Sequence, residues 1–143
     1  MRELDDLYGQ RERTIEGPLF DGDPFANSTA QPTTDELLIA SLIWKHRGRQ
    51  NPIAIARLRE LTGFTERQIK GIVEQLVVTH KIQIGGRRQE PVGYFVVEDA
   101  DDQAVAVEPY EAQIISMLRR LRVLASPRRL REFLGQLGLT GEE

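Results

Sequence analysis

The chain has 143 residues, no cysteine and a formal net charge of −3. This length allows one domain with extensions and a core that needs no covalent support. The missing cysteines exclude a disulfide framework and a thiolate metal site, and no apolar run approaches the roughly 20 residues of a membrane span. The first twenty residues lack the apolar stretch of a secretory signal, so we expect a cytoplasmic protein with no membrane partner.

The charge is distributed unevenly along the chain. Residues 1–34 are acidic, residues 35–98 are mildly basic, residues 99–108 are acidic again, and the last segment carries six arginines. A basic middle section is a weak sign of nucleic-acid binding, because such domains often have a pI above about 9, whereas the pI of this chain is about 5.5. An ordinary solvated surface is the alternative explanation.

Composition divides the chain into four segments. We expect an acidic, Pro/Gly-rich arm over residues 1–32, a folded domain over 33–98, an acidic linker over 99–108 and a helical extension over 109–143. Acidic residues of the arm are not followed by the later ligands of a calcium loop. No metal site and no cofactor are therefore expected.

Capping signals predict three helices in the middle segment. A capping box begins the first helix at Thr33, and this helix runs to about residue 46. The second helix covers about 54–61 and is followed by Gly63, a typical C-terminal residue. Thr65 and Gln68 form a second capping box for the third helix, about 65–81. One 100° sector of this helix holds its inward residues, which are Ile69, Ile72, Val73, Leu76 and His80.

The stretch IQIGGRRQEPVGYFVV, residues 82–97, predicts a β-hairpin. Two short β-prone runs flank a segment rich in glycine and arginine. We expect Gly85, Gly86, Arg87 and Arg88 at the tip. The fold class is therefore mainly α with a small β-hairpin.

This order of elements resembles the winged helix-turn-helix family. The stretch LTGFTERQ, residues 61–68, is similar to the turn into the recognition helix of bacterial regulators and phage-encoded DNA-binding proteins, and the GYF that ends the hairpin resembles prophage-type winged-helix proteins. The resemblance covers about residues 34–98. It implies a winged helix-turn-helix plus C-terminal helices, with the third helix reading double-stranded DNA and the hairpin acting as the wing.

The implied DNA contacts come from the outward face of the third helix and from the wing. Arginine, lysine and glutamine suit phosphates and base edges, and glycine permits close approach. The candidate residues are Thr65, Arg67, Gln68, Lys70, Gly71, Gln75, Gly86, Arg87 and Arg88. Further basic residues that could widen this footprint are Lys45, Arg47, Arg49, Arg57 and Arg59.

Other functions compete with DNA binding. Glu74 would repel phosphate and Val78 is apolar on the same helix face, so a module that binds a protein through this helix or the Trp44 surface is the main alternative. An adaptor whose acidic arm mimics or occludes DNA is another. No enzyme is expected, because the chain has no P-loop, no dinucleotide fingerprint and no nucleophile in a recognisable context, and His80 is expected to be buried and satisfied.

The last segment predicts two further helices. Pro109 suits the first turn of a long helix, and Ser126 with Pro127 predicts the start of a final one, with Leu130, Phe133, Leu134 and Leu137 inward. Apolar residues spaced 3, 4, 3, 4 and 3 form a heptad seam: Val107, Tyr110, Ile114, Met117, Leu121 and Leu124. The last five are candidates for a homodimer interface, which DNA readers use to match two half-sites; the alternative is packing on their own domain. The six arginines could contact the DNA backbone or pair with the acidic arm and linker.

Overall fold

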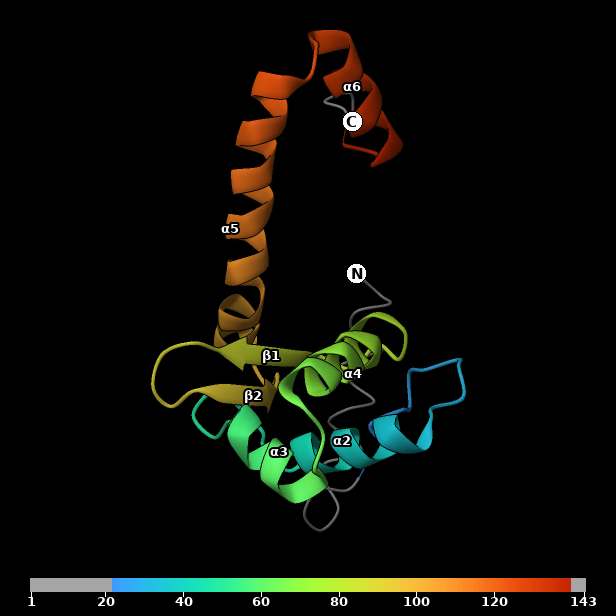
Figure 1. Cartoon of the computed structure of the whole chain (residues 1–143), viewed down its shortest axis with the longest axis vertical. Helices are drawn as coiled ribbons and strands as arrows, with labels where there is room; N and C mark the ends of the chain where they lie inside the picture. Colours follow the sequence, from blue (N-terminus) through green and yellow to red (C-terminus); the bar gives the residue numbers. More distant parts are fainter. Residues whose placement is uncertain (1–21, 140–143) are drawn as a thin grey trace. The chain divides into compact units, whose positions relative to one another are not determined.

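The computed structural model describes residues 22–139 and divides the chain into two units, Met1–Ala106 and Val107–Glu143. Residues 1–21 of the expected arm lie outside the described residues. The mainly α fold with a small hairpin is confirmed (Figure 1). Its elements are α2 (Thr34–Trp44), α3 (Ile55–Thr62), α4 (Glu66–Val78), β1 (Ile84–Arg87), β2 (Gly93–Val96), α5 (Ala100–Leu124) and α6 (Pro127–Gln136). None of the helices in residues 22–139 is long and apolar enough to cross a membrane.

The predicted caps begin α2 and α4. Thr33 Oγ1 accepts a hydrogen bond from the backbone N–H of Glu36 at 3.1 Å, and Glu36 Oε1 accepts one from the N–H of Thr33 at 2.9 Å. Thr65 and Gln68 form the same reciprocal pair at the start of α4, at 3.1 and 2.8 Å. Gly63 ends α3 with a φ of 78°, the left-handed conformation that favours glycine. These local signals therefore position the short turn between α3 and α4.

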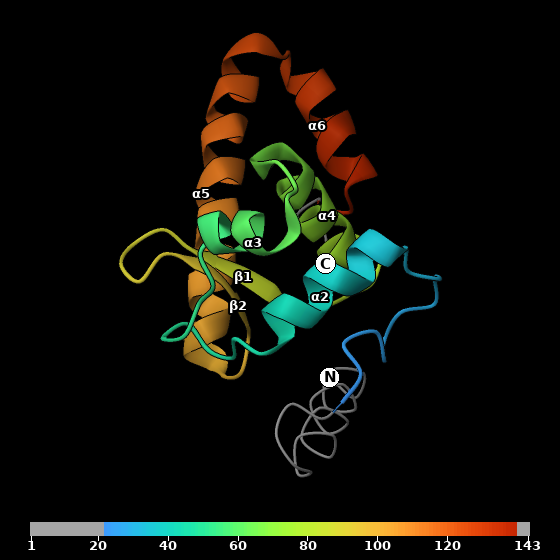
Figure 2. The same cartoon turned by 60° about the horizontal axis from the view of Figure 1, so that its bottom comes forward.

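The core of the first unit lies where α2, α3 and α4 meet beside the hairpin (Figures 1 and 2). α4 packs against both α2 and α3, and α2 also contacts β2. The fully buried side chains include Ile39, Ile43, Leu58, Ile69 and Leu76. Burying such a side chain contributes roughly 1.5–3 kcal/mol, so this cluster is what holds the three helices together.

The hairpin is shorter and its tip lies later than the sequence predicted. β1 and β2 pair antiparallel with Gly85 opposite Phe95, so the tip is residues 88–92. Gly85 is buried in β1, where a Cβ would lie 2.7 Å from both the Phe95 ring and the Cβ of Ala106. The expected tip position of Gly85, Gly86 and Arg87 was therefore wrong: all three lie in β1, where Gly85 makes room for the packed Phe95 ring.

The loop between α2 and α3 pairs with the other edge of β2. Ile53 and Tyr94 exchange two backbone hydrogen bonds, at 2.8 and 2.9 Å, and the N–H of Gly48 donates to the carbonyl of Val96 at 2.8 Å. At Gly93, where φ is 147°, a Cβ would lie 2.3 Å from the Ile53 carbonyl oxygen. This close approach requires glycine and fixes the position of the hairpin on the helices.

The acidic segment 99–108 is helical from Ala100 onward. α5 begins at Ala100, and Asp99 Oδ1 accepts a hydrogen bond from the backbone N–H of Asp102 at 2.7 Å. Acidic side chains in a first helical turn are favoured by the helix dipole, so the run EDADD starts a helix. Pro109 consequently lies inside α5, not in its first turn.

The second unit consists of α5 from Val107 onward and α6. Ser126 caps α6, since its Oγ accepts the N–H of Arg129 at 3.1 Å, and Pro127 occupies the first turn as the sequence predicted. Leu130 is half-buried on α6, as is Leu134, whereas Phe133 and Leu137 were expected inward and are exposed.

Candidate nucleic-acid interface

α4 is held to the rest of the first unit by one face only. Ile69, Val73 and Leu76 are buried against the core, while the opposite face is exposed. That exposed face carries Arg67, Lys70, Gly71, Glu74, Gln75 and Val78. The 3.6-residue helical period, from which the inward residues were predicted, therefore also predicted correctly which residues of α4 are exposed.

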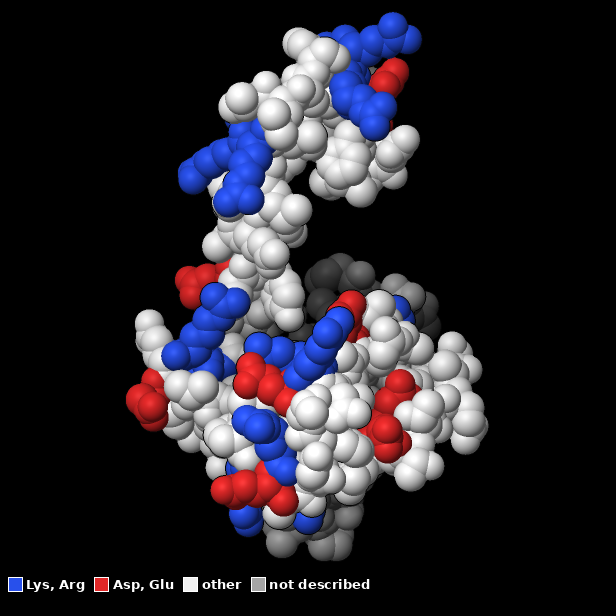
Figure 3. Space-filling view, in the orientation of Figure 1, with Lys and Arg blue, Asp and Glu red and all other residues white. Residues whose placement is uncertain are grey.

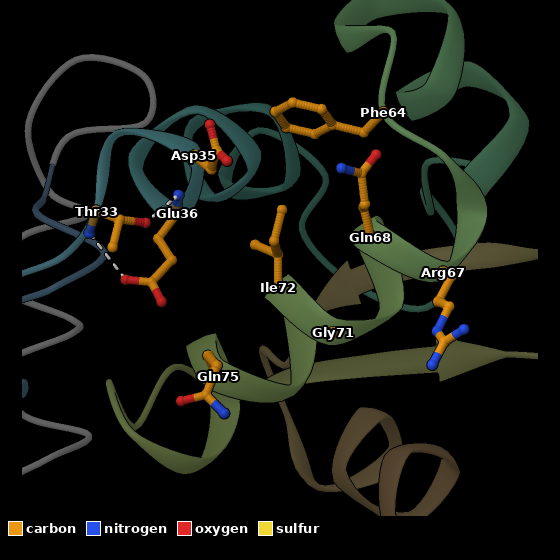
Figure 4. A pocket seen from close by; sticks show the side chains of 9 residues that line it. All are labelled: Thr33, Asp35, Glu36, Phe64, Arg67, Gln68, Gly71, Ile72 and Gln75. Atoms are coloured by element: carbon orange, nitrogen blue, oxygen red, sulfur yellow. Dashed lines mark hydrogen bonds between the residues drawn. The ribbon is translucent and has the colours of Figure 1, made fainter.

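A groove of about 270 Å³ runs between this face and the start of α2 (Figure 4). Ile72 and Phe64 supply its apolar floor, and Figure 4 shows Gln68 pointing toward Phe64 while Arg67 points away from the groove. The remaining lining residues are Thr33, Asp35, Glu36, Gly71 and Gln75. The structure thus brings together four of the candidate residues beside an acidic wall that the sequence did not indicate.

Several polar side chains of the α4 face already have partners. Gln68 Oε1 accepts the backbone N–H of Thr65 in the capping box, and Gln75 Oε1 accepts the hydroxyl of Thr79 at 2.7 Å. Both glutamines keep their amide nitrogen for donation to a ligand. Thr65 itself lies at the exposed helix start, where its hydroxyl is used by the cap.

Lys70 forms an ion pair with Glu66, with 2.9 Å between Nζ and Oε2. The hydrogen bond to this carboxylate and its negative charge raise the pKa of Lys70, and the same contact lowers the pKa of Glu66. Because a pair at this spacing is worth only about 0.3–0.5 kcal/mol on an exposed helix, a phosphate can compete for the lysine. Arg67, by contrast, forms no ion pair with any residue in 22–139.

The hairpin residues divide into structural and exposed ones. Arg87 Nη1 donates to the carbonyl oxygen of Arg49 at 2.8 Å and contacts Gln50 Oε1 at 3.4 Å, so it fastens β1 to the loop after α2. Gly86 is exposed on β1, and Arg88 is exposed at the beginning of the tip. Of the two wing cations proposed from sequence, Arg88 is therefore the one whose guanidinium has neither a hydrogen bond nor an ion pair within residues 22–139.

Two arginines that could have widened the footprint serve the fold instead. Arg47 Nε lies 2.7 Å from Glu98 Oε2, and its guanidinium carbon lies 4.5 Å from the centre of the Trp44 ring. Arg49 Nη1 lies 2.7 Å from the buried carboxylate of Asp102. The acidic run after the hairpin is the sequence signal that could have indicated these pairs.

Asp102 is the centre of this polar network. Its carboxylate accepts the backbone N–H groups of Arg49 and Glu98 as well as the Arg49 guanidinium. Burial acts to raise the pKa of Asp102, but these hydrogen bonds and the positive charge outweigh it, so the pKa lies below its ordinary value. The network joins the start of α5 to the loop after α2.

His80 is buried at the end of α4. Its Nδ1 lies 2.7 Å from Ser28 Oγ and its Nε2 lies 2.9 Å from Glu36 Oε1, while the ring of Phe25 meets it edge-on. The hydrogen bond from the N–H of Thr33, together with His80, lowers the pKa of Glu36 against the opposing effect of burial. As predicted, this histidine is a satisfied buried residue. Within residues 22–139 no group of three side chains is placed to hold a metal ion.

Charge is mixed over the first unit and mostly basic over the helices of the second. Figure 3 shows Lys and Arg side chains interleaved with Asp and Glu side chains over α4 and the hairpin, and a concentration of basic side chains on the C-terminal half of α5 and on α6. A continuous basic face linking α4 to the wing, which would have favoured DNA strongly, is not present on this view.

The heptad seam of α5 is exposed in the single chain. The exposed fractions are 68% for Tyr110, 57% for Ile114, 58% for Met117 and 84% for Leu124, and only Leu121 is half-buried. Within residues 107–139, neither α5 nor α6 buries these apolar side chains.

Comparison with known proteins does not assign the chain to a family. The chain matches no protein-family model, no curated protein and no solved structure.

Proposed function

We propose that this protein binds double-stranded DNA as a winged helix-turn-helix, with α4 as the recognition helix and residues 88–92 as the tip of the wing. It would act as a transcriptional regulator or as a phage-type replication or maintenance factor. Such a role requires the protein to share a compartment with DNA, as the expected cytoplasmic location allows.

One observation carries the proposal: α4 is anchored by a single face and offers an unpaired arginine at its exposed, capped start. The first turn of a helix points N–H groups and a positive dipole outward. Arg67 lies in that turn and has no ion-pair partner in residues 22–139. A guanidinium there is suited to a guanine edge or a phosphate.

The remaining candidate residues have different roles in this proposal: some contact DNA, and others only position the contacting elements. Gly71 presents open space on the same face, since a Cβ built there meets nothing within 4 Å. Lys70 and the amide nitrogens of Gln68 and Gln75 can add contacts after small adjustments. Arg88 supplies the wing contact, whereas Arg87 is proposed only to hold the wing in place.

We further propose that α5 forms a homodimer through its seam. Apolar side chains exposed at a 3–4 spacing need a partner, and two copies would present two recognition helices to two half-sites. The seam residues Tyr110, Ile114, Met117, Leu121 and Leu124 would form this interface.

A second candidate function is binding a protein segment in the groove beside α4. The specific observation is its apolar floor of Ile72 and Phe64 next to the acidic Asp35. Val78 lies outside the groove but is 57% exposed on the same helix. A short apolar segment with a basic residue would fit this chemistry.

Selection of bound duplexes from a random library, followed by affinity measurements, tests the DNA proposal. Loss of a bidentate base contact in Arg67→Ala should cost about 1–3 kcal/mol and relax preference at one base pair. Arg88→Ala should weaken all sequences alike and lower the salt slope by about 0.9. Lys81→Gln, which removes an exposed cation that donates to the Val78 carbonyl and is in no proposed contact, is the control.

Failure of the unaltered chain to bind any duplex at low salt would refute the proposal. The groove would then be the better candidate, and Asp35→Asn, which removes an acidic group of its lining, should weaken binding of a segment that carries a basic residue.

Sedimentation tests the dimer. Ile114→Glu places a charge in the seam and should give monomers with an unchanged helical signal. Ile115→Glu is the matched control, because Ile115 is also half exposed, at 50%, but lies off the seam. A dimer that survives Ile114→Glu would show that the seam does not form the interface.

A further inference from the structure

The C-terminal unit contains the sequence Arg-Arg-Leu-Arg twice, at residues 119–122 and 128–131. The first copy lies on α5 and the second on α6. In each copy the leucine, Leu121 or Leu130, is half-buried and the three arginines are exposed. The repeat therefore presents six guanidinium groups on two consecutive helices.

Helical geometry keeps these arginines away from the proposed dimer seam. At 100° per residue, Arg120 and Arg122 lie about 100° to either side of Leu121, and Arg119 lies about 160° from it. A dimer formed through the seam would bury Leu121 and leave Arg119 and Arg122 on the outside of α5, while Arg120 would flank the interface with its guanidinium still exposed.

Among residues 22–139, the acidic groups that directly precede the second unit are occupied elsewhere. Glu98 is paired with Arg47, and Asp99, Asp101 and Asp102 are paired with Arg49 in the first unit. The described part of the second unit contains six arginines but only three carboxylates, those of Glu108, Glu111 and Glu132. A single ion pair forms among them, Arg128 with Glu132 at 3.4 Å, between two exposed side chains.

This excess of positive charge contrasts with the first unit. There the arginines of the loop after α2 are paired, Lys70 is paired and Arg87 binds a backbone carbonyl, so α4 and the wing offer few free cations. Most of the affinity of DNA-binding proteins for any duplex comes from cations on phosphates. The α4 face is therefore short of the charge that duplex binding requires, and the second unit has it.

We propose that the two Arg-Arg-Leu-Arg segments form a second DNA contact, one that binds backbone phosphates without reading sequence. Guanidinium forks match phosphate oxygens, and phosphate contacts position a protein without carrying sequence information. The inference rests on the proposed function, because both take double-stranded DNA as the ligand. The two contacts then have different roles. The C-terminal unit supplies affinity for any duplex, and α4 supplies the preference for particular base sequences.

The test uses the full chain with Arg119→Gln, Arg120→Gln and Arg122→Gln together. Affinity for a random-sequence duplex is measured between about 50 and 200 mM salt. Each lost phosphate contact should lower the salt slope by about 0.9, so three lost contacts lower it by about 2.7 for each bound chain and make the loss of affinity over this range roughly 40-fold smaller per chain. The control replaces the same arginines by lysine, which keeps the charge and should keep most of the slope. Sedimentation and the helical signal must match the unaltered chain in both variants.

An unchanged slope in the glutamine variant would overturn the inference. So would binding of the unaltered chain to vesicles of phosphatidylserine and phosphatidylcholine without binding to the duplex, because the arginines would then serve a membrane surface. The companion variant, Arg67→Ala with Arg88→Ala, separates the two proposals. If it binds DNA as the unaltered chain does while the glutamine variant does not, the role of α4 fails and the phosphate contact stands.

Discussion

Replacing Gly71 by alanine should stabilise the folded chain. Gly71 lies within α4, and a Cβ built on it meets no heavy atom within 4 Å. Glycine in a helix interior costs about 0.5–1 kcal/mol relative to alanine, so the free energy of unfolding should rise by about that amount. For a unit the size of residues 22–106 the melting temperature should rise by roughly 2–8 °C.

Thermal unfolding followed by circular dichroism measures this change, and Gly63→Ala is the matched control. A Cβ at Gly63 also meets nothing within 4 Å, but its φ is 78°. A side chain in the left-handed region costs roughly 1–2 kcal/mol. The two substitutions add the same methyl group to open space and should shift the melting temperature in opposite directions.

The same variant tests the proposed DNA contact. If α4 enters the major groove with Gly71 against the duplex, the methyl group should weaken DNA binding although the protein is more stable. A lower melting temperature for Gly71→Ala would refute the description of the α4 face as open. A higher melting temperature with unchanged DNA affinity would refute the close approach at this residue.

Two further predictions concern the polar networks of the first unit. Asp102→Asn should lower the free energy of unfolding by about 1–3 kcal/mol, because the amide nitrogen cannot accept one of the two backbone N–H groups that the carboxylate accepts, although Arg49 keeps Asp99 and Asp101 as ion-pair partners; urea unfolding that matches the unaltered chain would contradict this. The pKa of Glu36 is held below 4.5 by the N–H of Thr33 and by His80, so its stabilising contribution is present above about pH 4.5 and is lost as the pH falls through the lowered value. In urea unfolding at neutral and acid pH, the free energy of unfolding of Glu36→Gln should change less with pH than that of the unaltered chain. An equal change in both proteins would show that this carboxylate does not contribute.

The sequence by itself determined where most helices begin and which face of α4 is buried. Thr33, Thr65 and Ser126 each cap the helix that follows, because a cap is a hydrogen bond between residues two or three apart. The inward sector of α4 was predicted for the same reason, since it depends only on the 3.6-residue period. The existence of the hairpin also followed from local composition.

The tertiary structure alone decided the register of the hairpin and the roles of its arginines. The tip lies at 88–92 because Gly93 must approach the Ile53 carbonyl and Gly85 must admit the Phe95 ring. The first contact joins the hairpin to a loop 40 residues earlier, and the second depends on the register between the two strands. Arg87 was expected to face DNA but binds a backbone carbonyl 38 residues earlier. An arginine in a sequence shows that a charge is present. Whether that charge is free for a ligand depends on partners brought near it by packing, which no local pattern contains.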